Sequence, residues 1–551
     1  MVRRPKWKCS TEHSKTWPLP CQYILRSAVS LPIIRIFYIE RESYSEFILN
    51  FASAFNSILS LSPKSNMAIY KNKAHISTNN NRQMRTWMLR LAIVAVFPTL
   101  ATPMTAQPKD LQAKVKEVFL QKLAQQEVAA TKGADDFRKG FSTDTELRQD
   151  IKNKQIADYR EMVWTAWREA NHDFKEDKLI APHALKAKEH GAWHLPAALE
   201  PNATMPFYFG SKKDAQSPAP LFVYLHGSGP KAQEWEVTWQ WAQIFDDAPS
   251  LYFVPQIPNE GGYYRWWQLS KQYAWEKLFR QALAYGVADA NRLYVLGVSE
   301  GGYGSQRLAS FYADYWAAAG PMAGGEPLKN APADNCANIG FSFLTGADDM
   351  GFYRNVLTSY TQAMFDSLQL AHPLSADKQP LFRHRINLVP GKQHHIDYRP
   401  TTPWLKQFSR NPYPKTVLWE DFDMDGRHRS GFYNLQVLAR PSDNRTYYEM
   451  NINGNHVDLR ISDVKYTTVQ KDPQWGIEMK FHRDYSEATG GKVRLYLCEQ
   501  LVDLSKPVEI TINGKKVFSG KVKASLQSMV SSCAEYFDPC RVYPAYIDLA
   551  Y

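Results

Sequence analysis

The stretch LYVLGVSEGGYGSQRLASFY, residues 293–312, passes from an apolar β-like run through a glycine-rich turn into an amphipathic segment. Residues 297–301 fit the pattern G-x-S-x-G, in which glycines permit a strained turn that lifts the serine hydroxyl clear of a sheet. The pentapeptide is common by chance, but its place between a predicted strand and a predicted helix gives it weight. Ser299 is therefore a candidate nucleophile, provided that the chain supplies a base, an acid and oxyanion donors.

The chain around this turn alternates between strand-like and helix-like segments. Near-continuous apolar strands separated by helices predict an α/β fold with a mostly parallel sheet covered on both faces. We expect strands at 221–225, 250–255, 292–297, 316–322, 340–345 and 385–389. We expect helices at about 232–245, 270–285, 300–313 and 353–370.

The acid and the base are expected after later strands. In IGFSFLTGADDMGFY a strand runs into two aspartates, and we prefer Asp349 to Asp348 because it lies three residues beyond the glycine. In RINLVPGKQHHIDYRP a strand is followed by two histidines, and we prefer His394 to His395 on the same spacing. In α/β-hydrolases the triad follows the chain order Ser, then Asp or Glu, then His, and these candidates have that order.

Backbone donors for an oxyanion are expected upstream, where LFVYLHGSG ends a strand in a turn of small residues. Gly227 or Ser228 should supply one N–H, and Glu300, the residue after the nucleophile, should supply the other. His226 is expected to be structural.

These segments resemble a known family. LHGSG, GVSEGGYG, TGADD and PGKQHHIDYRP are similar to the corresponding motifs of secreted serine esterases and predicted peptidases of the α/β-hydrolase superfamily. The resemblance covers about residues 185–412. Within the superfamily, the segments are most similar to those of polysaccharide esterases that remove acetyl, feruloyl or methyl ester groups. It implies the α/β-hydrolase fold and the triad, and it constrains the acyl group only loosely, since this scaffold serves many chemistries.

An aromatic segment follows one of the predicted strands. Tyr264, Arg265, Trp266 and Trp267 lie where the carboxyl ends of strands bind ligands, so we expect them to contact substrate. Aromatic faces suit sugar rings, and the guanidinium could pair with a uronate carboxylate. The alternative is that both tryptophans pack beneath the loop.

The N-terminal region carries most of the charge. Of the formal +11, residues 1–83 hold twelve Lys or Arg against four Glu, and the chain after Ala106 is almost neutral. This distribution removes the main support for a nucleic-acid partner. MRTWMLRLAIVAVFPTLATPMTAQ, which begins at Met84, has the basic, apolar and small-residue parts of a secretory signal peptide. We expect an exported protein, periplasmic or secreted, with no stable membrane anchor beyond that signal.

We divide the chain into five parts. Residues 1–83 are a spurious extension before the true start, 84–106 the signal peptide and 107–180 a helical N-terminal extension. Residues 181–415 form the α/β-hydrolase catalytic domain. Residues 416–551 alternate in short strands with Asn-Gly turns, which predicts a C-terminal all-β domain like a sandwich.

The mature chain would keep four cysteines, and proximity makes Cys533 with Cys540 the favoured disulfide pair. DFDMDG, residues 421–426, begins like a calcium loop, but Phe432 stands where a bidentate carboxylate is needed. We predict no metal and no cofactor.

The function expected from these observations is an exported serine esterase acting on ester-decorated polysaccharide or oligosaccharide. Two alternatives stay open: a serine peptidase with the same triad, and a carbohydrate-binding protein with a degenerate hydrolase domain. Because candidates for all three triad members are present, the sequence argues against the degenerate, carbohydrate-binding alternative.

Overall fold

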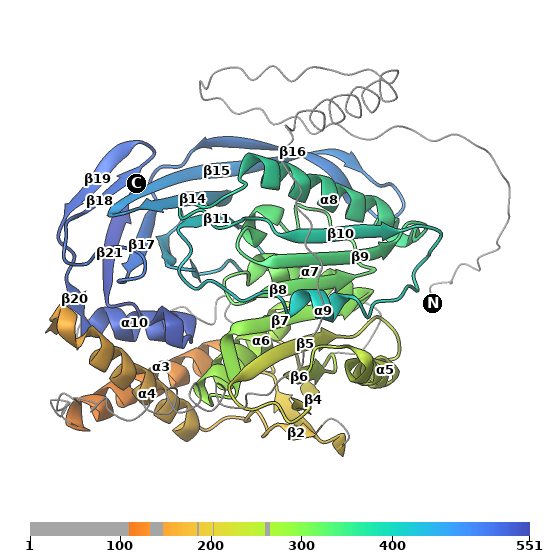
Figure 1. Ribbon diagram of the computed structural model, residues 1–551, viewed down its shortest axis with the longest axis horizontal. Coiled ribbons are helices and arrows are strands. Elements are labelled where there is room, and N and C mark those ends of the chain that lie inside the picture. The colour runs from red at the N-terminus through yellow and green to blue at the C-terminus, as the bar shows by residue number, and fades with distance from the viewer. Residues whose placement is uncertain (1–108, 133–146, 185–186, 202, 259–264) are drawn as a thin grey trace, which may run out of the picture. The chain divides into compact units, whose positions relative to one another are not determined.

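The structure, a computed structural model, describes residues 109–132, 147–184, 187–201, 203–258 and 265–551 (Figure 1). The predicted extension 1–83, the predicted signal peptide 84–106 and Tyr264 lie outside the described residues. Within the described residues, every helix is too short or too polar to span a lipid bilayer.

The central element among the described residues is a nine-stranded sheet. Its strands are β2 (His183–Ala184), β3 (His190–His194), β4 (Thr204–Lys212), β5 (Ala219–Leu225), β6 (Ser250–Pro255), β7 (Ala288–Val298), β8 (Ala318–Met322), β9 (Gly340–Gly346) and β10 (His384–Val389). Their order is β10-β9-β8-β7-β5-β6-β4-β2, with β3 paired to β4. From β10 to β6 every pair is parallel, and β4 runs antiparallel to β6. This mostly parallel sheet confirms the predicted α/β fold.

Helices cover both faces of this sheet. They are α5 (Lys231–Ile244), α6 (Leu269–Ala284), α7 (Glu300–Phe311), α8 (Arg354–Ala371) and α9 (Thr401–Leu405), with 3-10 turns η3 (Ala333–Cys336) and η4 (Gly351–Tyr353). Strand β5 shows why two faces are needed. Leu221 and Val223 join one apolar cluster while Phe222 and Tyr224 join another, because successive side chains of a strand point to opposite faces. A strand that is apolar at every position must be covered twice.

Two N-terminal helices, α3 (Lys109–Thr131) and α4 (Ile156–Asp173), follow the predicted helical periodicity. Phe119 and Trp167 join them edge to face, with ring centroids 4.9 Å apart. Trp167 also stacks on Phe537 at 5.7 Å, so these helices pack against the C-terminal end of the chain (Figure 1). A short strand β1 (Asp150–Ile151) and the turn η1 (Asn153–Gln155) lie between them.

The C-terminal region forms two further sheets. One contains β11 (Thr416–Asp421), β14 (Arg445–Asn453), β15 (His456–Lys471), β16 (Glu478–Glu487), β18 (Val508–Ile512) and β19 (Lys515–Gly520). The other contains β12 (Gly431–Phe432), β13 (Leu435–Ala439), β17 (Lys492–Leu497) and β21 (Ala545–Ala550). Trp419 of the first sheet stacks on Phe432 of the second at 5.3 Å, which gives the sandwich-like contact expected from the strand pattern.

The prediction that this region is all β needs a correction, because it contains the buried helix α10 (Leu526–Tyr536), with β20 (Ala524–Ser525) before it and η5 (Pro539–Arg541) after it. Its apolar residues Leu526, Met529 and Cys533 recur at helical spacing, a signal that the strand prediction for this region overlooked. Its start carries a second signal, since Ser525 caps it by accepting a hydrogen bond from the Ser528 N–H.

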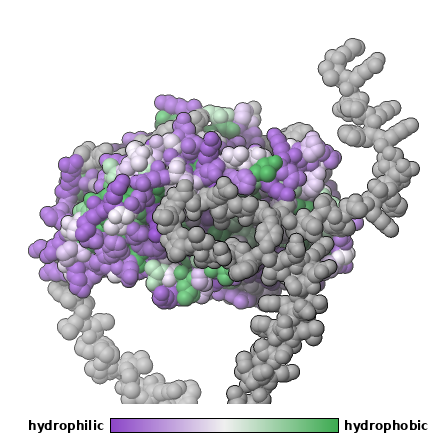
Figure 2. All heavy atoms as spheres, turned by 90° about the horizontal axis from the view of Figure 1, so that it is seen from above, coloured by the Kyte–Doolittle hydropathy of each residue, from purple (hydrophilic) through white to green (hydrophobic). Residues whose placement is uncertain are grey.

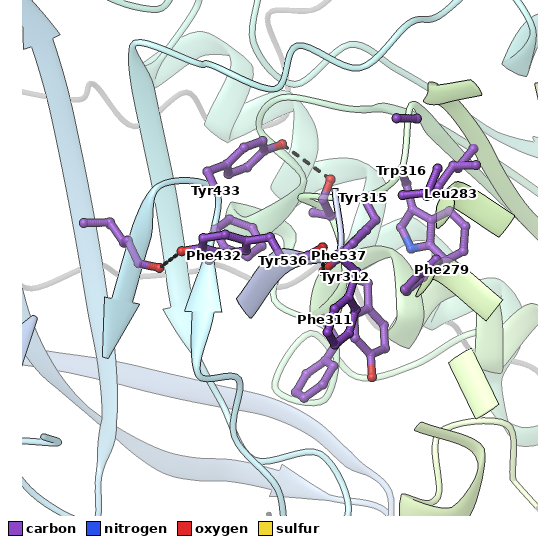
Figure 3. Packing of buried hydrophobic residues seen from close by; sticks show 14 of the residues in the cluster. Phe279, Leu283, Phe311, Tyr312, Tyr315, Trp316, Phe432, Tyr433, Tyr536 and Phe537 are labelled. Carbon is purple, nitrogen blue, oxygen red and sulfur yellow. Dashed lines mark hydrogen bonds between the residues drawn. The ribbon is translucent and has the colours of Figure 1, made fainter. Parts of the chain in front are cut away.

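The C-terminal region and the α/β sheet share one apolar core (Figure 3). Phe279 of α6 stacks on Tyr315, which follows α7, at 4.5 Å, and the Tyr315 hydroxyl donates to the backbone carbonyl of Tyr536 at the end of α10, at 2.7 Å. The two regions therefore fold as one packed unit.

The predicted Cys533–Cys540 disulfide is wrong, since Cys336, Cys498, Cys533 and Cys540 are all free thiols. Cys533 lies on the buried side of α10, and Cys540 lies beside Asn291 with its Sγ 3.9 Å from the amide. Proximity in sequence does not predict a disulfide where a helix directs one thiol into the core.

The visible surface is mostly polar: among the described residues in Figure 2, hydrophilic side chains predominate.

Candidate active site

Ser299 stands at the turn between β7 and α7, with φ 58° and ψ −115°. A positive φ is strained for a residue with a side chain, and such strain persists where the surroundings enforce it. The Ser299 N–H donates to the Met322 carbonyl of β8 at 3.0 Å. Gly301 lets the start of α7 lie close to β5, because a Cβ on Gly301 would lie 2.1 Å from the Leu225 oxygen.

His394 and Asp349 come together from the loops after β10 and β9. His394 Nδ1 lies 2.7 Å from Asp349 Oδ2, and the other carboxylate oxygen accepts from Arg354 Nη1 at 3.0 Å. Burial alone would raise the pKa of Asp349, but the His394 hydrogen bond and the Arg354 charge outweigh it and lower that pKa. The acid is therefore ionised and holds His394 as the tautomer with hydrogen on Nδ1, which leaves Nε2 free to act as a base.

The geometry separates the two pairs of neighbouring candidates. Asp349 is buried and Asp348 is exposed, while His394 is half-buried and His395 is exposed. The Tyr398 hydroxyl also donates to the His394 carbonyl, which fixes the backbone of that loop. The strand-end spacing thus selects the two residues that the structure brings together.

The two residues predicted to supply an oxyanion donor after β5 both lie beside the nucleophile. A Cβ on Gly227 would lie 3.6 Å from the Ser299 Cβ, and Ser228 lines the cavity beside Ser299. Glu300 begins α7, where backbone N–H groups lack helical partners and the helix dipole is positive. Gly227 or Ser228, together with Glu300, are therefore the candidate backbone donors.

His226 is a structural residue, as expected. Its Nδ1 lies 2.7 Å from the Gly227 carbonyl, and its Nε2 accepts from the Ile257 N–H at 3.0 Å. Burial lowers the pKa of His226 to about 4, so it is neutral at ordinary pH.

The prediction that Trp266 contacts substrate is wrong. Its side chain has no exposed surface, and its Nε1 donates to the His226 carbonyl at 3.0 Å. The ring also packs against Gly304 of α7, where a Cβ would lie 2.6 Å from the Trp266 Cβ. Trp266 therefore packs beneath the loop. The alternative prediction, that both tryptophans pack there, is correct for this one.

Arg265 and Trp267 do line a cavity of about 880 Å³ that opens beside Ser299. The Arg307 guanidinium lies 3.9 Å from the Trp267 ring centroid and forms an ion pair with Glu326, Nε to Oε1 3.0 Å. The cavity thus combines aromatic faces with charged groups, a lining that suits an amphipathic ligand such as a sugar.

Glu300 contributes a carboxyl group as well as a backbone N–H. Its side chain is 8% exposed, and Oε2 lies 3.6 Å from Arg265 Nη1. Burial, partly opposed by the Arg265 charge, raises the pKa of Glu300 to about 8. A neutral carboxylic acid therefore stands next to the nucleophile at neutral pH.

Sequence reasoning missed two parts of the site. Arg354 pairs with the triad acid, and residues 471–478 of the β15–β16 hairpin form one wall of the cavity. A basic residue five positions after Asp349 was a weak signal for the first, but only the tertiary fold brings the hairpin there. Among the described residues no cluster of three or more His, Cys, Asp or Glu could hold a metal ion.

No protein-family model matches the chain, and no curated protein matches it. Solved structures similar to part of it include a thermostable esterase, with 21% identity and a TM-score of 0.32 over 40% of this chain. The chain spans 63% of that esterase. A ferulic acid esterase has 12% identity and a TM-score of 0.29, covering 40% of this chain and 97% of its own. An acetyl xylan esterase from Aspergillus awamori has 12% identity and a TM-score of 0.29, covering 39% of this chain and 98% of its own.

Proposed function

We propose that the protein is a serine hydrolase that cleaves carboxylic esters carried by saccharides. The observation that supports this proposal is the combination of a strained Ser299 at the β7–α7 turn with a hydrogen-bonded His394–Asp349 pair at neighbouring strand ends. These three groups are the nucleophile, the base and the orienting acid that acyl transfer requires.

In the first half-reaction the Ser299 oxygen attacks the ester carbonyl carbon, and His394 Nε2 takes the hydroxyl proton. The carbonyl oxygen becomes an oxyanion, which the backbone N–H groups of Gly227 or Ser228 and of Glu300 stabilise. When the intermediate collapses, the bond to the alcohol oxygen breaks, and His394 returns the proton to that oxygen. The alcohol leaves and the acyl group stays on Ser299.

In the second half-reaction water replaces the alcohol. His394 removes a proton from the water as it attacks the acyl carbon, and the same two N–H groups hold the second oxyanion. Collapse releases the carboxylic acid, and the proton on His394 returns to Ser299. Asp349 stays ionised throughout and stabilises the imidazolium that forms twice in the cycle.

The ester groups proposed are acetyl, feruloyl or methyl groups on plant polysaccharide. The cavity supports a saccharide because aromatic rings and paired charges line it together, and stacking with hydrogen bonding is how proteins hold sugar rings.

Substrate profiling tests the proposal. Purified protein should release acetate, ferulate or methanol from esterified xylo-oligosaccharides or pectic oligosaccharides, and Ser299→Ala should abolish that release with an unchanged melting temperature. A fluorophosphonate should label the wild type at Ser299 and leave the variant unlabelled. Cleavage of peptides with no ester hydrolysis would assign a peptidase, and absence of any adduct on Ser299 would assign a binding role.

We propose in addition that the protein is exported by way of the segment that begins at Met84. N-terminal sequencing of the protein from its native source should find a start near Gln107. A mature chain that retains Lys64 would contradict this proposal.

A further inference from the structure

The C-terminal region sends a two-stranded arm to the active-site cavity. Strand β14 pairs with β15 only as far as Val464, whereas β15 and β16 stay paired up to Lys471 and Glu478. The residues beyond Val464 therefore extend past the rest of their sheet. We call residues 465–484 the arm and residues 471–478 its tip.

The tip is a turn ordered by its own hydrogen bonds. Asp472 is buried, its Oδ2 accepts from the Trp475 N–H at 2.5 Å, and its N–H donates to the Ile477 carbonyl at 2.8 Å. Gly476 takes φ 70°, which a glycine adopts without strain. These bonds hold the turn in one conformation and present its side chains to the cavity in fixed positions.

The tip is also attached to the catalytic sheet. The Asp472 carboxylate accepts from the Tyr353 hydroxyl at 2.7 Å, and Glu478 forms an ion pair with Lys329, Oε2 to Nζ 2.8 Å. Nearer the base of the arm, Arg483 pairs with Asp334 at 2.8 Å.

The segment that receives the tip is strained. Phe352 and Tyr353 are consecutive residues in the left-handed region, with φ 52° and 57°. Each costs of order 1 kcal/mol or more for a residue with a side chain, and such strain is kept where the surroundings enforce it, often at functional sites. The next residue, Arg354, pairs with Asp349 and lies 5.2 Å from the Phe352 ring centroid. Phe352 is therefore fixed between the arm and the triad acid.

The contact between arm and segment is an exposed aromatic pair. The rings of Phe352 and Trp475 lie 4.6 Å apart at 53°, and both line the cavity. They are 44% and 52% exposed, and they are the two aromatic rings among the well-exposed large apolar side chains of the described residues. Two open aromatic faces beside a nucleophile cost hydrophobic free energy unless a ligand covers them.

We propose that Phe352 and Trp475 form a stacking subsite for a sugar ring of the substrate, so that the arm selects saccharide esters over esters of simple alcohols. This inference rests on the proposed function. A sugar ring has an apolar C–H face that covers an aromatic ring, and hydroxyl groups around its edge. Asn330, Lys471 and Glu478 line the same cavity and supply hydrogen-bond partners for those hydroxyls. The subsite specifies a sugar and leaves the acyl group to the space beside Ser299.

The test compares two esters in the full-length protein. Trp475→Ala should lower kcat/KM for an acetylated xylo-oligosaccharide about tenfold, through KM, because one stacking face is lost. The same variant should hydrolyse 4-nitrophenyl acetate within about twofold of the wild type, because that ester makes no use of a sugar subsite. Trp475→Phe should restore most of the lost saccharide activity.

Val469→Ala is the matched control, because Val469 lies on the same arm, is exposed and lies outside the cavity lining. It should leave both activities unchanged. Equal losses of Trp475→Ala on both esters, or no loss on the saccharide ester, would overturn the subsite. If the wild type hydrolysed neither ester, the proposed function itself would fail, which is a different outcome.

Discussion

At the scale of single residues, neighbouring side chains of the same type have different roles. Asp348 and Asp349 differ only in which way the loop after β9 turns them, and Asp349 alone of the two is buried against His394 and Arg354. The role of each carboxyl group thus comes from its position, so the same substitution at the two residues is a controlled comparison.

We predict that Asp349→Asn lowers kcat for 4-nitrophenyl acetate by about 10⁴-fold, because an amide in place of the carboxylate favours the wrong His394 tautomer. Asp348→Asn should stay within about twofold of the wild type. Steady-state kinetics of the two variants, with melting temperatures to verify folding, provide the measurement. A large loss in Asp348→Asn with Asp349→Asn active would reverse the assignment of the acid.

Glu300 gives a second residue-scale prediction, in stability. Its pKa is raised to about 8 from 4.5, so the folded state keeps a proton that the unfolded state releases between those pH values. The free energy of unfolding of the wild type therefore falls as pH rises through this window, by roughly 1.4 kcal/mol for each unit of pKa difference at most. Glu300→Gln keeps the backbone N–H and removes the titration.

Urea unfolding at pH 5, 7 and 9 measures this effect. The stability of Glu300→Gln relative to the wild type should grow from pH 5 to pH 8 and then level off. A difference that stays constant with pH would show that burial does not hold the Glu300 carboxyl in its neutral form.

At the scale of elements, the β7–α7 turn requires the backbones of β5, β7 and α7 to lie close together. A Cβ on Gly301 would lie 2.1 Å from the Leu225 oxygen, and backbone of β5 cannot move aside without opening the sheet. We predict that Gly301→Ala lowers the free energy of unfolding by about 1–3 kcal/mol or more and reduces activity, because the turn that presents Ser299 must shift.

Gly520→Ala is the control for that substitution. A Cβ there would meet the Phe518 ring at 3.5 Å, an ordinary contact, and no positive φ is required. It should change stability little. Chemical denaturation of both variants gives the comparison, and equal stabilities would contradict a tight β5–α7 approach.

Elements were predictable where local pattern and tertiary role agree. Each of the six strands from β5 to β10 contains an apolar run bounded by turns, so their positions followed from the sequence, and with them the strand-end places of Ser299, Asp349 and His394. Strands β2 to β4 at the edge lack such runs, and β4 contains Pro206 and Gly210. Helix α10 was missed although its apolar residues recur at helical spacing, because the strand pattern of the surrounding region was extended over it.

Other features of the site depend on contacts that no local pattern encodes. The burial of Trp266 against His226 and the arrival of Trp475 at the cavity both arise from segments distant in the chain. Sequence reasoning could propose that the aromatic segment binds substrate, but it could not say which of its rings face the cavity.

At the scale of the whole molecule, the C-terminal region braces the helix that starts at the nucleophile. Asp314, just after α7, accepts from both Arg429 and Arg541 of the C-terminal region, at 3.0 and 2.5 Å. Arg541 also donates to Asp538 at 2.7 Å, and Arg410 donates to Asp538 at 2.6 Å. All five side chains are buried, so each charge depends on its partners.

We predict that Asp314→Asn lowers the free energy of unfolding by about 3–5 kcal/mol, because it leaves buried guanidinium groups without a compensating charge. The cluster also makes stability depend on pH. Despite complete burial, the neighbouring guanidinium charges lower the pKa of Asp314 and bring that of Asp538 to about 2. Because both folded pKa values lie below the ordinary 3.8, the stabilisation is present above pH 4 and is lost as pH falls toward 2.

Asp397→Asn serves as the control, because Asp397 forms an exposed ion pair with Arg399 and should contribute nothing measurable. Denaturation of the three proteins at pH 7 and at pH 3 tests the prediction. The wild type and Asp397→Asn should lose stability together between these pH values, and Asp314→Asn should lose less because one titrating group is absent. If Asp314→Asn matched the wild type at pH 7, the buried charges would not join the two regions. The shared apolar core and the arm would then be what joins the C-terminal region to the active site.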